Sequence, residues 1–199
     1  MMAAILEIPE VRQRVSPLSV EEYHRLGEYN ERGHRTELIH GIVIEKMSKS
    51  PLHRLIASLL YRRLLAQVPK GFSVWKEEPL TFLDSEPEPD ISVTRGEEHD
   101  YAQAHPTTAE LVIEVAVSNP ALDRENPTLY AKAAIKEYWI VLGSEHRVEV
   151  YRHPEHGRYQ EQRLYGADDL LECAALPEVR LRVCELFCGP SEHFAAPAG

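Results

Sequence analysis

Asp90 and Glu114 are the residues whose types and spacing most clearly suggest chemistry. Asp90 follows Glu-Pro at 88–89, and Glu114 stands in the middle of the apolar run ELVIEVAVS. A charge inside an apolar strand is costly unless it is paired, hydrogen-bonded or bound to a metal. Two carboxylates with a backbone carbonyl and water form an oxygen-rich site of the kind that Mg²⁺ or Mn²⁺ prefers. Such an ion can activate water and stabilise charge on a phosphodiester.

Side-chain alternation along a strand predicts how these two carboxylates are positioned. In residues 110–118 the apolar side chains at every second position share one face, which leaves Glu114 on the other. In residues 90–94 the side chains of Asp90 and Ser92 share a face. Two neighbouring strands could therefore bring Asp90 and Glu114 together. The same spacing fits two solvated carboxylates at strand ends, and the pattern by itself leaves both interpretations open.

Caps, turns and hydrophobic periods predict the surrounding elements. Ser-Val-Glu-Glu at 19–22 is a capping box that begins a short helix, and residues 36–47 form a strand or a hairpin turning at His40-Gly41. Ser50-Pro51 caps a strong helix with a 3.6-residue leucine period. The other expected elements are an extended segment at 72–83, a strand at 90–94, a loop at 99–108, a strand at 110–118, a helix from Pro127 to Ala134 capped by Asn126, a strand at 137–142, and a hairpin of 147–152 with 158–165.

The order of these elements predicts an α/β (α+β) fold with a mixed sheet. We expect a flexible lead-in at 1–17, one domain at 18–188, which ends with the hairpin as a C-terminal extension, and a disordered tail at 189–199. Three cysteines without a CxxC pattern argue against a disulfide framework and a zinc site. No apolar run reaches the roughly 20 residues of a membrane span, and the N-terminus does not resemble a signal peptide. A cytoplasmic protein is therefore expected.

The charge of the chain is unevenly distributed. The net charge of -10 opposes non-specific binding to nucleic acid, whose phosphates are contacted by lysine and arginine. From Lys46 to Lys76 there is no aspartate or glutamate, whereas from Glu77 to Glu114 eleven carboxylates are accompanied only by Arg95. This pattern fits a phosphate-facing surface beside a metal site, and it equally fits two solvated faces of opposite sign.

Several segments in order resemble one known family. They are TELIHGIVIEKM with Ser50-Pro51-x-His53, then EPEPDISVTR, ELVIEVAVS, LDREN…LYAKAAIKEYWIVL and VEVYR. From about Ser19 to Phe187 the chain resembles the bacterial putative restriction endonuclease family of the PD-(D/E)xK nuclease superfamily. The resemblance implies a restriction-endonuclease-like fold, in which a central mixed sheet is flanked by helices. It also implies a divalent metal, Mg²⁺ or Mn²⁺, and DNA as the substrate.

The resemblance assigns roles to individual positions. Asp90 matches the aspartate of the PD motif, Glu114 the second acidic residue, and Glu37 an acidic residue supplied from the first part of the fold. These three would bind the metal, and Asp90 and Glu114 would be catalytic. For Glu37, a partner role toward Arg35 or His40 is an equal alternative.

The family's lysine position departs from the pattern. The superfamily lysine would fall at Ala116, and in this family it moves to a following helix, where an ungapped match places it at Asn126. Asparagine can form hydrogen bonds but carries no charge, and Asn126 before Pro127 also fits a helix cap. Lys132 and Lys136 are possible substitutes, although Lys132 lies about 240° around the helix from Asn126. A catalytically degenerate protein that binds nucleic acid or protein is therefore the alternative function.

Three basic residues are weaker candidates for contacts with DNA phosphates: His53, Arg54 and Arg124. Solvated side chains are the simpler interpretation for all three. Because nucleases of this kind often cut the two strands as pairs, the resemblance also implies a homodimer. The sequence itself shows no interface.

Overall fold

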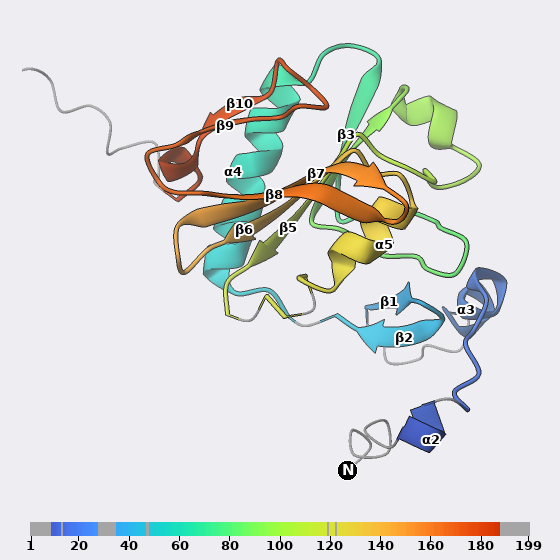
Figure 1. Ribbon diagram of the computed structural model, residues 1–199. Coiled ribbons are helices and arrows are strands. Elements are labelled where there is room, and N and C mark those ends of the chain that lie inside the picture. Colours follow the sequence, from blue (N-terminus) through green and yellow to red (C-terminus); the bar gives the residue numbers. More distant parts are fainter. Residues whose placement is uncertain are drawn as a thin grey trace, which may run out of the picture. The chain divides into compact units, whose positions relative to one another are not determined.

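The computed structural model describes residues 9–12, 14–27, 35–46, 48–118, 120–121 and 123–187, which form two compact units. The first unit comprises residues up to 47 together with 81–87, and the second comprises 48–80 and the residues from 88 onward. The tail at 189–199 and most of the lead-in lie outside the described residues, although a one-turn helix, α2 (Pro9–Arg12), falls within the lead-in (Figure 1). The domain bounds 18–188 stay a prediction. No described helix is long and apolar enough to cross a membrane.

The first unit is built around a hairpin. Tyr23 belongs to helix α3, and its hydroxyl donates to the backbone oxygen of Thr36 at 2.7 Å. The hairpin turns at His40 and Gly41, whose φ angles of 50° and 74° suit the two-residue turn that matches strand twist. The capping box at 19–22 and the hairpin are therefore confirmed. The elements of this unit are α3 (Val20–Gly27), β1 (Thr36–Ile39) and β2 (Ile42–Glu45).

The second unit contains a six-stranded sheet in the order β3-β4-β5-β6-β7-β8. β5 and β6 are parallel and every other neighbouring pair is antiparallel, so the sheet is mixed and the expected fold class is confirmed. The expected late hairpin forms the last two strands of the sheet. The strands are β3 (Phe72–Lys76), β4 (Ile91–Arg95), β5 (Leu111–Ala116), β6 (Glu137–Leu142), β7 (Arg147–Glu155) and β8 (Arg158–Tyr165).

Two helices cover the sheet from opposite faces (Figure 1). α4 (Pro51–Gln67) contributes Ile56, Leu60 and Leu64 to a core that includes Ile113 and Trp139. α5 (Asn126–Lys132) packs on the face formed by the alternate positions of the same strands, where the rings of Tyr130 and Tyr138 have centroids 4.7 Å apart. α4 begins at the expected cap, because Ser50 Oγ accepts the backbone N–H of His53.

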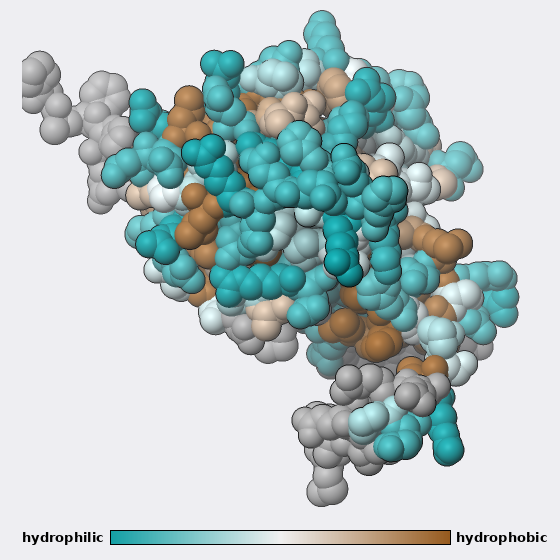
Figure 2. Space-filling view, in the orientation of Figure 1, coloured by the Kyte–Doolittle hydropathy of each residue, from teal (hydrophilic) through white to brown (hydrophobic). Residues whose placement is uncertain are grey.

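Smaller elements correct the sequence-based expectations. The extended segment at 72–83 is a strand only to Lys76, because Glu77 adopts a left-handed φ of 59°. The expected loop at 99–108 begins within η1 (Glu98–Tyr101), whose capping box joins Glu97 and Asp100. An additional hairpin and short helix, which were not expected, follow β8: β9 (Leu170–Glu172), β10 (Arg180–Arg182) and η2 (Val183–Leu186). The surface over β7 and β8 is mainly hydrophilic (Figure 2).

Candidate active site

The register of β4 and β5 brings the two predicted carboxylates together. Ile91 pairs with Ile113 in an antiparallel ladder, so one step further along the same register Asp90 lies opposite Glu114. The backbone N–H of Asp90 donates to Glu114 Oε2 at 3.1 Å, and that of Val115 donates to Asp90 Oδ2 at 2.8 Å. The pairing of two strands therefore fixes the two carboxylates beside one another at one end of the sheet.

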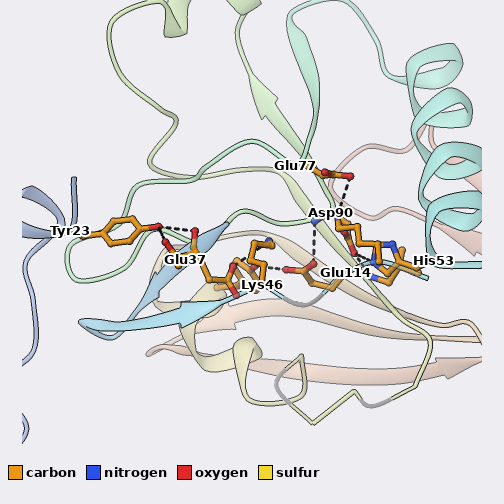
Figure 3. Close-up of polar contacts among 11 residues, drawn as sticks. Tyr23, Glu37, Lys46, His53, Glu77, Asp90 and Glu114 are labelled. Carbon is orange, nitrogen blue, oxygen red and sulfur yellow. Dashed lines mark hydrogen bonds and ion pairs between the residues drawn. The ribbon is translucent and has the colours of Figure 1, made fainter. Parts of the chain in front are cut away.

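The start of α4 supplies two further groups to Asp90. His53 lies in the first turn, and its Nε2 is 2.9 Å from Asp90 Oδ2; because a carboxylate only accepts, Nε2 carries the donated proton. Lys49 precedes the helix cap, and its Nζ is 2.6 Å from Asp90 Oδ1. Figure 3 shows His53, Asp90 and Glu114 side by side. In the described part of the chain the buried Nδ1 of His53 has no hydrogen-bond partner.

Glu114 is held from the other side by α5. The hydroxyl of Tyr130, a residue with 0% exposure, donates to Glu114 Oε1 at 3.0 Å. The ring of Tyr138 packs beside Tyr130, and burial together with the charge of Glu114 raises the pKa of Tyr138 well above its ordinary value. Tyr130 thus fixes the orientation of the Glu114 carboxylate.

The surroundings of Asp90 keep its carboxyl group ionised. Burial alone would raise the pKa of Asp90, but the hydrogen bond and charge of His53 and the charge of Lys49 together lower it from 3.8 to about 2. Burial would likewise lower the pKa of Lys49, but the contacts with Asp90 and Glu77 raise it. The buried pair is therefore a carboxylate and an ammonium across the neutral range.

We predict an acid-dependent loss of stability from this pair. Because the folded-state pKa of Asp90 lies below the unfolded value of 3.8, its contribution is complete above that value and is lost as the pH falls through about 2. The size of the difference corresponds to about 2 kcal/mol. The free energies of unfolding of the wild-type protein and of Asp90→Asn should converge as the pH falls from above 3.8 toward about 2. Urea titrations at a series of pH values measure them. Parallel curves would contradict the assignment.

Glu37 belongs to the first unit, whereas Asp90 and Glu114 belong to the second. Its Oε2 lies 3.4 Å from Lys46 Nζ, across the β1–β2 hairpin, and the two side chains are 13% and 15% exposed. His40, one of its expected alternative partners, contacts Asp84.

Asn126 is not a helix cap. Glu125 occupies the cap position, and Asn126 is the first residue of α5, 6% exposed. Pro127 is tolerated in the first turn because its missing N–H would have no partner there. Asn126 lies four positions before Tyr130, and such residues share a helix face, so the family's lysine position is oriented toward the Glu114 side of the sheet.

The two lysines considered as substitutes have other contacts. Lys136 forms an ion pair with Glu110, four residues before Glu114 and therefore about 13 Å away along the strand. The stem of Lys132 packs over Gly157, where an added Cβ would lie 2.9 Å from Lys132 Cγ. These contacts do not bring either lysine to the Asp90–Glu114 pair.

The weaker phosphate-contact candidates differ in their surroundings. Arg54 is exposed on α4. Arg124 is 47% exposed and forms an ion pair with Glu149, its Nε donating to Oε1 at 3.1 Å. His53 is directed at Asp90 rather than outward, and its side chain is 13% exposed.

Sequence reasoning missed three residues that belong to this site: Lys49, Glu77 and Tyr130. Lys49 was visible only as one charge in the segment without carboxylates, and its position directly before the Ser50 cap was the available signal. Tyr130 could have been found from its spacing of four from Asn126. Glu77 offered no signal, because its position depends on a left-handed backbone conformation.

Comparison with known proteins identifies two similarities. A family model described as "Putative restriction endonuclease" (Uma2) matches residues 20–184, which is most of the chain. Among solved structures, the chain is similar to a putative nuclease belonging to DUF820 from Anabaena variabilis ATCC 29413, with a TM-score of 0.73 and 24% sequence identity over 86% of this chain and 98% of that chain. A search of the curated proteins found no match. The structural similarity, at this identity, shows the fold.

Proposed function

Because the chain belongs to the putative restriction endonuclease family, we propose that it is an endonuclease that hydrolyses DNA phosphodiester bonds with a divalent cation. The observation that carries the proposal is the pair formed by Asp90 and Glu114, in which the backbone N–H of Asp90 donates to the Glu114 carboxylate at 3.1 Å. Both carboxylates are fixed by donors from neighbouring elements. Preorganised groups of this kind cost no reorganisation during reaction.

The donor chemistry of the pair fits Mg²⁺ or Mn²⁺. The four carboxylate oxygens of Asp90 and Glu114 are hard ligands. Mg²⁺ commonly binds one or two carboxylates and keeps several of its water molecules. The proposed ion would be held by Asp90 and Glu114 together with water. Once bound, the cation would supply a Lewis acid for the phosphate and a more acidic water.

The chain's own residues position the reactants. In the proposed reaction a water oxygen bonds to phosphorus, the bond from phosphorus to one ester oxygen breaks, the water releases a proton, and the leaving alkoxide takes one up. The Asp90 N–H and the Tyr130 hydroxyl hold the two oxygens of Glu114. His53 holds Asp90 from the start of α4. These contacts fix the orientation of both carboxylates.

A plasmid-nicking assay tests this function. We expect the wild-type protein to convert supercoiled plasmid to the open circle with Mg²⁺ or Mn²⁺ and to stop in EDTA. Glu114→Gln should lower the rate about 100-fold, because it removes one ligand charge. Glu98→Gln is the matched control, since Glu98 is exposed. Equal rates for the wild-type protein and Glu114→Gln would refute the proposal.

Asn126 favours a second candidate function. A protein that keeps the fold but has an uncharged side chain at the lysine position could bind DNA without cutting it. Fluorescence anisotropy with labelled duplex, measured at several salt concentrations, separates the two functions. Binding that weakens with salt, with no nicking in either metal, identifies the binding protein.

A further inference from the structure

We propose that Lys49 is the catalytic cation of this site and takes the role that Asn126 cannot fill. The inference rests on the proposed function. Hydrolysis of a phosphodiester increases negative charge on the phosphate oxygens, and a fixed positive charge beside them stabilises the transition state. Asn126 carries no charge, so in a cleaving protein this charge has to come from another element of the second unit.

Lys49 has the position that this role requires. Its Nζ lies 2.6 Å from Asp90 Oδ1, on the carboxylate proposed to bind the metal. The side chain is 17% exposed, so it is held in place and still reaches solvent. Of the three ammonium N–H donors, Asp90 and Glu77 use two within the described residues, and the third can donate to a phosphate oxygen.

Glu77 is the second carboxylate that holds Lys49 in place. Its Oε1 lies 3.0 Å from Lys49 Nζ, and its backbone N–H donates to the carbonyl oxygen of Asp90 at 3.2 Å. Glu77 has a φ of 59°, a left-handed conformation that costs a non-glycine residue of order 1 kcal/mol or more. A strained residue that places a carboxylate on Lys49 indicates that the lysine position is built into the site.

The simpler alternative is that Lys49 only neutralises buried Asp90. The two roles differ in their effect on metal binding. A cation at Asp90 must approach the Lys49 ammonium, so the lysine opposes metal binding while it assists cleavage. A purely structural lysine would instead support the carboxylate geometry on which metal binding depends.

The test uses three variants of the full chain. Lys49→Met removes the charge and keeps the aliphatic stem, Lys49→Arg keeps the charge, and Asn126→Lys is added to Lys49→Met to return a cation from α5. Plasmid nicking, Mn²⁺ affinity by calorimetry, and the thermal unfolding midpoint are measured for each. We expect Lys49→Met to lower the nicking rate about 100-fold while it binds Mn²⁺ at least as tightly as the wild-type protein. Asn126→Lys should recover about tenfold of the rate, and Lys49→Arg should lose less than Lys49→Met.

Each other result overturns the inference. If Lys49→Met nicks plasmid at the wild-type rate, the charge of Lys49 is not needed for cleavage. The inference then fails while the proposed function stands. Weaker Mn²⁺ binding that parallels the loss of rate shows a structural role, and absence of recovery with Asn126→Lys shows that the two positions are not equivalent. Absence of nicking by the wild-type protein refutes the proposed function and the inference with it.

Discussion

Asp90→Asn is expected to lower the metal-dependent nicking rate about 1,000-fold. A bound divalent cation contributes several kcal/mol of transition-state stabilisation, and each 1.4 kcal/mol is a factor of ten in rate. Asparagine keeps the shape of aspartate but removes the charge to which the proposed ion binds. The rate of plasmid nicking and the Mn²⁺ affinity should fall together.

The matched control for this substitution is Asp168→Asn, because Asp168 is an exposed aspartate in the segment between β8 and β9. Its rate should remain at the wild-type value. Folding of Asp90→Asn is checked by its unfolding midpoint at neutral pH. A folded Asp90→Asn protein that nicks at the wild-type rate would place the chemistry elsewhere in the molecule.

The second large effect is expected on stability. Glu137→Ala should lower the free energy of unfolding by about 3–5 kcal/mol, because it removes the buried carboxylate on which Arg152, Trp139 and two backbone N–H groups converge. Glu137 has 0% exposure, and its Oε1 accepts from Arg152 Nε at 2.9 Å and from Trp139 Nε1 at 2.8 Å. Its Oε2 accepts the backbone N–H groups of Ala174 and Ala175 at 2.7 and 3.3 Å. Glu137 therefore joins the start of β6 to β7 and to the segment after β9.

Glu161→Ala is the control for the same arginine. Glu161 is 42% exposed and lies 3.8 Å from Arg152, and exposed pairs of this kind contribute about 0–1 kcal/mol. Both variants are compared with the wild-type protein by urea denaturation at neutral pH. A loss below about 1 kcal/mol for Glu137→Ala would contradict the importance of this buried network.

Local sequence determined the elements that depend on short-range physics. The hairpin at 36–47 follows from a β-branched run with a two-residue turn, and α4 follows from Ser50-Pro51 and a leucine period. The strand at 110–118 follows from alternation, and the mixed sheet follows from the order of elements. The hairpin, α4 and the strand each depend on neighbours a few residues apart, which the sequence displays directly.

Buried carboxylates were predictable only in part. The isolated charge in ELVIEVAVS singled out Glu114, because an apolar strand makes an interior charge conspicuous. Glu137 is the first residue of an equally apolar strand and was not singled out. A charged residue at the end of a strand is ordinarily explained by exposure to solvent. Its five donors come from residues up to 38 positions away, which no local pattern reveals.

The sequence by itself therefore determined the family, the mixed fold and the acidic pair as a candidate, and the tertiary structure decided which groups surround that pair. Lys49 and Asp90 are 41 positions apart, and Glu114 is another 24 positions beyond Asp90. Their contact depends on strand register and on where α4 begins over the sheet, and these are set by packing of the whole core rather than by any segment. The resemblance to the family places the catalytic lysine at Asn126, which carries no charge. Packing of the core instead brings Lys49 to the Asp90 carboxylate.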